Sequence, residues 1–127
     1  MGYRSDVAYV IKFESFEKRD AFVALMLAKN NGDITQAISE IKHDYKDDPI
    51  ITFECDDVKW YPDFADVQAH EYLYKQAHEL FDADYRFLAV GEDGAETFDE
   101  ADEHGTLYDY ISTVHRKIGR AHVWTPV

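Results

Sequence analysis

Cysteine, proline and long apolar runs are all scarce in this 127-residue chain, which has one cysteine and three prolines. Because the single cysteine, Cys55, has no partner within the chain, packing rather than disulfides must hold the fold, and a reducing cytoplasm is the expected compartment. No apolar run approaches the ~20 residues of a membrane span, so we expect no membrane partner. The opening residues, MGYRSDV, lack the basic and apolar order of a signal peptide.

Basic residues are also few, since 13 of them face 26 acidic residues and leave a formal net charge of -13. A protein face that follows nucleic-acid phosphates needs clustered lysine and arginine, so direct DNA or RNA binding is disfavoured. Such acidity is typical of a soluble surface. A second interpretation stays open, in which the acidic surface imitates nucleic-acid phosphates and docks on a basic protein.

Apolar and aromatic residues are plentiful, at 46% and 15% of the chain. These contents indicate a folded protein, and the length indicates one domain with enough core to fold unaided. We assign that domain to residues 1–117. Residues 118–127, IGRAHVWTPV, resemble a translated sequencing adapter and are expected to be a non-native tail. The alternative is that they form a natural terminal strand.

Hydrophobic periodicity predicts an α+β fold. Strands are expected over 6–13, 50–53, 58–61, 85–90 and 107–117, and helices over 15–29, 33–45 and 66–81. Ser15 and Asp33 are expected to cap the first two helices. The two strands between residues 50 and 61 are expected to form a β-hairpin around an acidic turn over 54–57. Phe53 and Trp60 are hypothesised to pair across this hairpin.

This order of elements resembles a ferredoxin-like split βαβ sandwich with an extra C-terminal strand. An antiparallel or mixed sheet would carry its helices on one face and leave the other face open to solvent or to a partner. Residues 91–105 are expected to form an acidic loop, and the strand over 107–117 is expected to lie at a sheet edge.

Few residues carry the signature of a metal or catalytic site. His70 and His78 lie eight positions apart, too far to chelate one ion together, and His70 falls on an apolar helix stripe that predicts a packed side chain. His104 and Thr106 make a lone H-x-T motif, whereas two-histidine phosphoesterases need two such motifs. Neighbouring acids are expected to raise the pKa of Cys55 and to weaken it as a nucleophile. The sequence therefore predicts no metal, no cofactor and no catalytic turnover.

Aromatic residues and one arginine concentrate on or beside the expected strands. The candidate ligand-binding residues are Tyr3, Arg4, Trp60, Tyr61, Tyr108 and Tyr110. An arginine among aromatic rings can pair with a phosphate while a ring stacks on a base. Two other interpretations stay open, because several of these side chains can belong to the core, or can form a protein interface, where Tyr, Trp and Arg are enriched.

Three segments of the chain occur together: the opening MGYRSDV, the block VKWY-x-DF-x-DV that begins at Val58, and the GED sequence that begins at Gly91. In this combination the chain resembles a group of small uncharacterised bacteriophage proteins. The likeness extends to Lys117, although members of the group have a more basic or isoleucine-rich strand before GED, where this chain has FLAV. The resemblance implies a phage accessory protein that acts in the cytoplasm of an infected bacterium.

Small phage accessory proteins without catalytic motifs often disarm host defence, which is an argument by association. The preferred hypothesis is that the chain sequesters a nucleotide-type immune signal without turnover. The alternatives are an acidic, DNA-mimic-type inhibitor of a basic host protein and a structural or assembly protein of the virion. A homo-oligomer is compatible with each of these.

Overall fold

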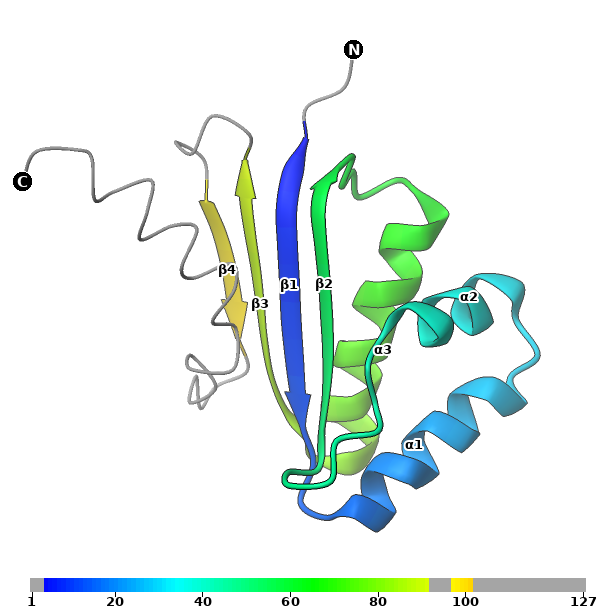
Figure 1. Cartoon of the computed structure of the whole chain (residues 1–127). Helices are drawn as coiled ribbons and strands as arrows, with labels where there is room; N and C mark the ends of the chain where they lie inside the picture. Colours follow the sequence, from blue (N-terminus) through cyan, green and yellow to red (C-terminus); the bar gives the residue numbers. More distant parts are fainter. Residues whose placement is uncertain (1–3, 92–96, 102–127) are drawn as a thin grey trace, which may run out of the picture.

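A computed structural model describes residues 4–91 and 97–101, and the side chains of residues 4–91. The elements in chain order are β1 (Ser5–Lys12), α1 (Phe16–Ala28), α2 (Gly32–Glu40), β2 (Ile50–Val58), α3 (Ala65–Phe81), β3 (Asp84–Gly91) and β4 (Thr97–Ala101). The three helices lie to one side of the sheet (Figure 1). The predicted α+β fold with helices on one sheet face is confirmed.

The sheet has the strand order β2-β1-β3-β4, and each pair of neighbours is antiparallel. Tyr9 in the central strand β1 has Phe53 of β2 on one side and Phe87 of β3 on the other. Because β2 and β3 are both antiparallel to β1, they run parallel to each other, and α3 connects them with β1 in between. This connection is a split βαβ unit, so that part of the prediction is confirmed.

The predicted hairpin is wrong, because β2 is one continuous strand through the acidic residues that were expected to turn. Cys55 and Glu54 pair with Val7 and Ala8 of β1. As the outermost strand, β2 can carry exposed charges that would be costly in the sheet interior. The strand ends near Asp57, which has a positive φ of 54° and whose N–H donates to the Asp6 carboxylate at 2.9 Å.

The N-terminal caps of the first two helices agree with the sequence prediction in one case and differ in the other. The Ser15 hydroxyl accepts from the N–H of Lys18 at 3.1 Å, so the predicted cap of α1 is confirmed. The second helix is capped by Asn31 rather than by Asp33, and it ends at Glu40 instead of near residue 45. Because α2 ends early, the segment over 41–49 lies outside the helix, and residues 43–46 form one wall of a pocket.

Both faces of the sheet contribute to the core. The odd-numbered residues Val7, Tyr9 and Ile11 of β1 belong to the main cluster with the helices. Even-numbered residues on the opposite face form a second buried cluster, which contains Ala8, Val10, Ile50, Leu88 and Val90, with Tyr45 packed against it. Since Val10 is completely buried, the expectation of an open second face is wrong for this part of the sheet.

The remaining sequence predictions concern the residues that follow β3. Residues 97–101, expected to lie in an acidic loop, form β4 and pair with β3, with Phe98 opposite Ala89. The loop prediction is therefore wrong for these residues, because sheet pairing overrides their acidic composition. The strand expected over 107–117 and the tail over 118–127 lie outside the described residues.

Candidate functional site

Three of the six residues predicted to bind a ligand, Tyr3, Tyr108 and Tyr110, lie outside the described part of the chain. Arg4 directs its guanidinium at Asp57, where Nη1 donates to the main-chain carbonyl at 2.9 Å and lies 3.9 Å from the carboxylate. Both side chains are well exposed, at 44% and 75%, so this ion pair is screened by water and contributes little stability.

Trp60 and Tyr61 follow β2 and have different partners. The Trp60 ring lies 5.9 Å from Phe53, 5.7 Å from His70 and 6.0 Å from Phe87, measured between centroids. The hypothesis that Trp60 pairs with Phe53 across a hairpin is wrong, because β2 is one continuous strand and Trp60 follows it; the two rings nevertheless lie close together. Tyr61 meets Phe64 edge-on at 5.1 Å. These ring contacts place Trp60 against the core, and the ligand-binding role of Arg4, Trp60 and Tyr61 stays a prediction.

His70 lies at the centre of a buried hydrogen-bonded triad with Tyr9 and Glu40, which we call the His70 triad. His70 is 1% exposed, as its place on the apolar stripe of α3 predicted. Its Nδ1 is 2.7 Å from the Tyr9 hydroxyl, and its Nε2 is 2.8 Å from a Glu40 carboxylate oxygen. A carboxylate only accepts, so Nε2–H donates to Glu40 and the Tyr9 O–H donates to Nδ1. Neutral imidazole satisfies both bonds with one tautomer.

The pKa directions agree with a neutral His70 and a neutral Tyr9. Burial lowers the pKa of His70, and hydrogen bonding and attraction to Glu40 only partly oppose that effect. Burial also raises the pKa of Tyr9 well above its usual value, with Tyr74 and Glu40 adding to the shift. Tyr9 and His70 are both almost completely enclosed, so a ligand could touch only the half-exposed Glu40. The His70 triad therefore joins β1, α2 and α3 and lacks the access that a catalytic group needs.

Cys55 lies in β2, close enough to Glu40 of the His70 triad for that charge to affect its thiol. Burial is the largest cause that raises the pKa of its thiol, followed by the negative charges of Glu40, Asp56 and Asp6. The predicted direction of the shift is confirmed, and the neutral thiol is a poor nucleophile.

A surface hollow of about 510 Å³ lies between the first turn of α1 and the segment that follows α2. We call it the Arg19 pocket; its lining residues are Phe16, Arg19, Asp20, His43, Asp44, Tyr45 and Lys46. Two aromatic rings, an arginine, a lysine and a histidine therefore meet at one place on a strongly acidic protein.

Arg19 is the unusual member of this pocket, because its side chain is only 7% exposed. Its Nη1 donates to the Tyr45 carbonyl at 2.7 Å and reaches the Asp48 carbonyl at 3.4 Å, while Nε donates to the Asp20 carboxylate at 3.2 Å. Within residues 4–91, Nη2 has no hydrogen-bond acceptor. A buried guanidinium normally has its charge and donors compensated, so two N–H groups are left for another acceptor.

The opposite wall of the Arg19 pocket is fixed by the edge strand. The Tyr45 hydroxyl bonds the Thr52 hydroxyl at 2.8 Å, and Lys42 exchanges two main-chain hydrogen bonds with Thr52. The Lys42 ammonium lies 4.7 Å from the centroid of the Tyr45 ring. On the α1 side the guanidinium carbon of Arg19 lies 5.1 Å from the centroid of the Phe16 ring. These contacts hold the two aromatic walls in place before any ligand arrives.

Arg19 was not among the predicted site residues, because it lies within a helix and the predicted site was built from residues on or beside strands. A signal was present, however. Arg19, Phe22, Val23 and Met26 are spaced i, i+3, i+4 and i+7 and form the buried face of α1. An arginine in line with apolar positions predicts a buried cation, and a buried cation requires a search for its acceptors.

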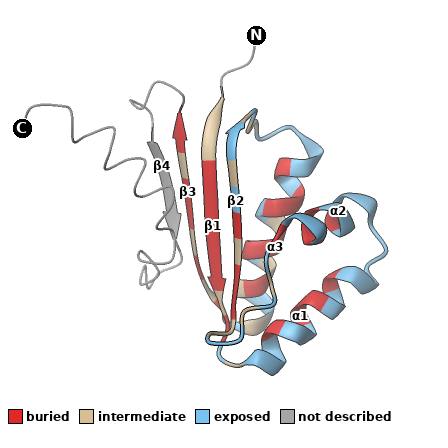
Figure 2. Cartoon of the chain, viewed as in Figure 1, coloured by how far each residue is buried: buried red, intermediate tan, exposed pale blue. Residues whose placement is uncertain are grey.

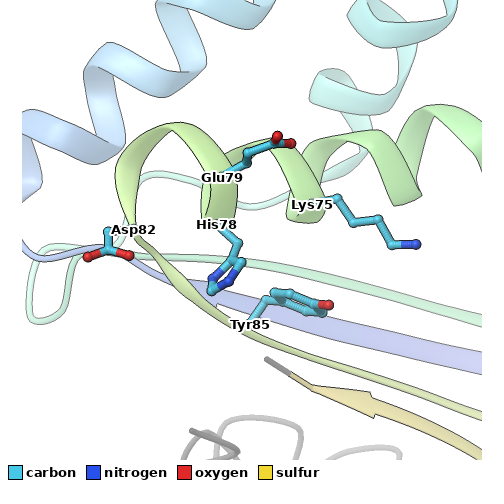
Figure 3. Close-up of a pocket in the computed structure, with 5 residues that line it drawn as sticks. All are labelled: Lys75, His78, Glu79, Asp82 and Tyr85. Atoms are coloured by element: carbon cyan, nitrogen blue, oxygen red, sulfur yellow. The ribbon is translucent and has the colours of Figure 1, made fainter. Parts of the chain in front are cut away.

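A second hollow, of about 450 Å³, lies at the C-terminal end of α3 and is lined by Lys75, His78, Glu79, Asp82 and Tyr85. Figure 3 shows the His78 and Tyr85 rings side by side below the helix, with Lys75 and Glu79 directed away from them. The Ala83 carbonyl, 2.9 Å from Nδ1, fixes the tautomer of His78, and Lys75 pairs with Glu71 at 3.6 Å. Among the described residues, no buried side chain of this hollow lacks a partner, and its lining has two acids and one lysine, so we favour the Arg19 pocket.

Comparison with known proteins leaves these sites to be judged on their own geometry. No family model, curated protein or solved structure matches the chain. Among the described residues, no group of three or more His, Cys, Asp or Glu side chains could hold a metal ion. In the same part of the chain, no helix is both long enough and apolar enough to cross a membrane.

Proposed function

We propose that this protein binds and sequesters a small nucleotide-type anion without converting it, and that it does so as a phage accessory protein directed against a host immune signal. The observation that supports the proposal is the Arg19 pocket, where a nearly buried guanidinium keeps two donors in reserve between two aromatic walls. The phage origin is supported by the sequence resemblance given above.

The pocket offers the two contacts that a nucleotide needs. A guanidinium pairs with phosphate oxygens in a planar, two-pronged geometry, and an exposed ring stacks on a base. Phe16 is 39% exposed, which leaves part of its ring available to a base. Lys46 and His43 line the same pocket and can add further donors to the phosphate.

Net acidity does not prevent anion binding at this place. An ion pair at 4 Å is worth about 4 kcal/mol at an effective dielectric constant near 20, whereas exposed charges beyond about 10 Å are largely screened at 0.1 M salt. The nearby Arg19 and Lys46 therefore outweigh distant acids. Asp20 and Asp44 also line the pocket and reduce the attraction. Because salt screens the remaining attraction of Arg19 and Lys46 for an anion, binding should weaken as salt rises.

The side chains that line the pocket also support binding of the ligand without chemical conversion. None of the residues named for the pocket is a serine, threonine or cysteine, and His43 is its one imidazole. General acid–base chemistry needs a group placed within hydrogen-bond reach of a nucleophile or leaving group. The lining lacks a serine, threonine or cysteine nucleophile, and this supports a ligand that is held rather than converted.

Thermal unfolding with a panel of cyclic nucleotides and ADP-ribose derivatives tests the proposal. At least one member of the panel should raise the melting temperature, and heating should release it chemically intact, as chromatography would show. Recovery of an altered product would overturn the claim that the protein does not convert its ligand.

Two matched arginine variants test where the ligand binds. Arg19→Gln should remove the stabilisation by the ligand, and Arg4→Gln, the same change at the originally predicted residue, should leave it in place. Lys46→Ala, at an exposed lining residue, should weaken binding even if Arg19→Gln folds poorly. If Arg4 is required and Arg19 and Lys46 are dispensable, the ligand binds at Arg4, as the sequence predicts, and not in the Arg19 pocket.

A second function is favoured by a separate observation. Glu54, Asp56 and Asp57 are exposed on the edge strand β2, where they could approach a basic protein as the phosphates of DNA do. Tight binding to a basic nuclease, together with unchanged melting in every nucleotide, would favour this acidic inhibitor over the nucleotide-binding proposal.

A further inference from the structure

The last two turns of the first helix, residues 21–28, are apolar on the outside as well as on the inside. Its inner face is formed by the buried residues Arg19, Phe22, Val23 and Met26. The outer residues Ala21, Ala24, Leu25 and Ala28 are all exposed, and their spacing of i, i+3, i+4 and i+7 places them in one stripe. Figure 2 shows exposed residues along the side of α1 that faces away from the sheet.

This outer stripe contrasts with the rest of the surface. Residues 21–28, AFVALMLA, include no charged side chain in a chain whose net charge is -13. Leu25 and the neighbouring Leu27 are 40% and 44% exposed. A helix that is apolar all round is normally covered by another element, and alanines in the stripe let a second helix approach closely.

Charge indicates which partner fits. Copies of an acidic protein repel one another, so two copies can meet most readily where charge is absent. The N-terminal end of α1 carries the acids Glu14, Glu17 and Asp20 and one exposed base, Lys18, which pairs with Glu14, so this end is acidic on balance; Lys29 follows the C-terminal end. An antiparallel pair of α1 helices would place the acidic end of one copy near Lys29 of the other and would set the two helix dipoles in opposition, which is favourable.

We infer that the outer stripe of α1 is the contact between two copies of this protein, related by a two-fold axis with the helices antiparallel. Such a contact is self-complementary, because the same residues serve both copies. The patch is one short helix wide, well below the ~800 Å² per partner of a standard interface. We therefore expect a weak dimer, visible at roughly 100 µM and above and dissociated at nanomolar concentration.

Sedimentation equilibrium of the full chain across this concentration range tests the inference. The wild type should shift from monomer to dimer, and Leu25→Glu should weaken dimerisation at least tenfold, because it places two like charges in an apolar contact. Leu80→Glu, at a leucine of α3 that is 53% exposed, is the matched control and should leave the equilibrium unchanged. A wild type that stays monomeric at every concentration would overturn the inference.

Charge reversal tests the antiparallel arrangement. Lys29→Glu should weaken the dimer severalfold, and adding Glu17→Lys to the same chain should restore it, because the ends then carry exchanged charges. Equal weakening by Leu25→Glu and Leu80→Glu, or no rescue by the second charge change, would contradict an α1–α1 contact. Leu25 and Lys29 lie outside the residues that line the Arg19 pocket, so nucleotide binding should persist in the Leu25→Glu and Lys29→Glu variants.

Discussion

The His70 triad and the Arg19 pocket each contain a polar side chain that is almost fully buried, yet they differ in how that side chain is satisfied. In the triad both ring nitrogens of His70 have a partner within 2.8 Å. In the pocket the guanidinium of Arg19 leaves Nη2 without an acceptor among residues 4–91. Burial of a polar side chain therefore does not by itself indicate a binding site. A buried polar side chain with a hydrogen-bond donor that lacks an acceptor does indicate a candidate site.

The largest effect is expected in the triad. His70→Ala should lower the free energy of unfolding by about 3 kcal/mol, because it opens a cavity beside Phe53 and strands the Tyr9 hydroxyl. Urea unfolding checks the value. His78→Ala, at the half-exposed histidine of the same helix, is the control and should cost clearly less. A cost below about 1 kcal/mol for His70→Ala would mean that the triad does not organise the core.

The next effect concerns Arg19 and sharpens the contrast. Without ligand, Arg19→Met should cost less than about 1.5 kcal/mol in urea unfolding, because a buried, incompletely paired charge is often replaced by an apolar side chain at little cost. Tyr45 and Asp48, whose carbonyls it leaves, are half-buried residues, so water can replace the lost donors. If Arg19→Met lowers the free energy of unfolding as much as His70→Ala does, then Arg19 mainly stabilises the fold. The main reason for proposing a ligand site at the Arg19 pocket would then be lost.

A smaller effect tests the hydrogen bond within the triad. Tyr9→Phe keeps the ring contacts with Phe53 and Tyr74 but removes the donor to Nδ1 of His70. The expected loss is about 1–2 kcal/mol, the cost of leaving one buried acceptor unmatched. Tyr45→Phe, which removes the half-buried hydroxyl that bonds Thr52, should cost less. Equal losses in the two variants would argue that the His70 acceptor is satisfied by water.

The smallest effect is the dependence of stability on pH. Because the folded pKa of His70 is lowered, the unfolded chain binds more protons between that pKa and about 6.5. The contribution of His70 is therefore fully present above pH 6.5 and is lost as pH falls through the folded pKa. Urea unfolding of wild type and His70→Gln between pH 7.5 and 5 should show a steeper decline in the wild type. Parallel curves would contradict a neutral, buried His70.

Local patterns predicted much of the fold, and long-range relations account for most of what was missed. The Ser15 cap and the buried place of His70 both follow from spacing within one helix. The acidic residues 54–57 were read as a turn because composition does not show that β2 pairs with β1 at a sheet edge. The Arg19 pocket was missed for a similar reason, since its walls, Phe16 and Tyr45, are far apart in sequence and meet only once α2 ends early and Lys42 bonds Thr52.

The most direct test of the anion-binding claim is nitrogen-resolved NMR of the arginine side chains during titration with cyclic nucleotides and ADP-ribose. The account predicts that the guanidinium signal of Arg19 shifts and saturates with at least one of these ligands, while the signal of Arg4 stays in place. A saturable shift at Arg4 with Arg19 unchanged, or no shift at either arginine at millimolar ligand, would contradict it.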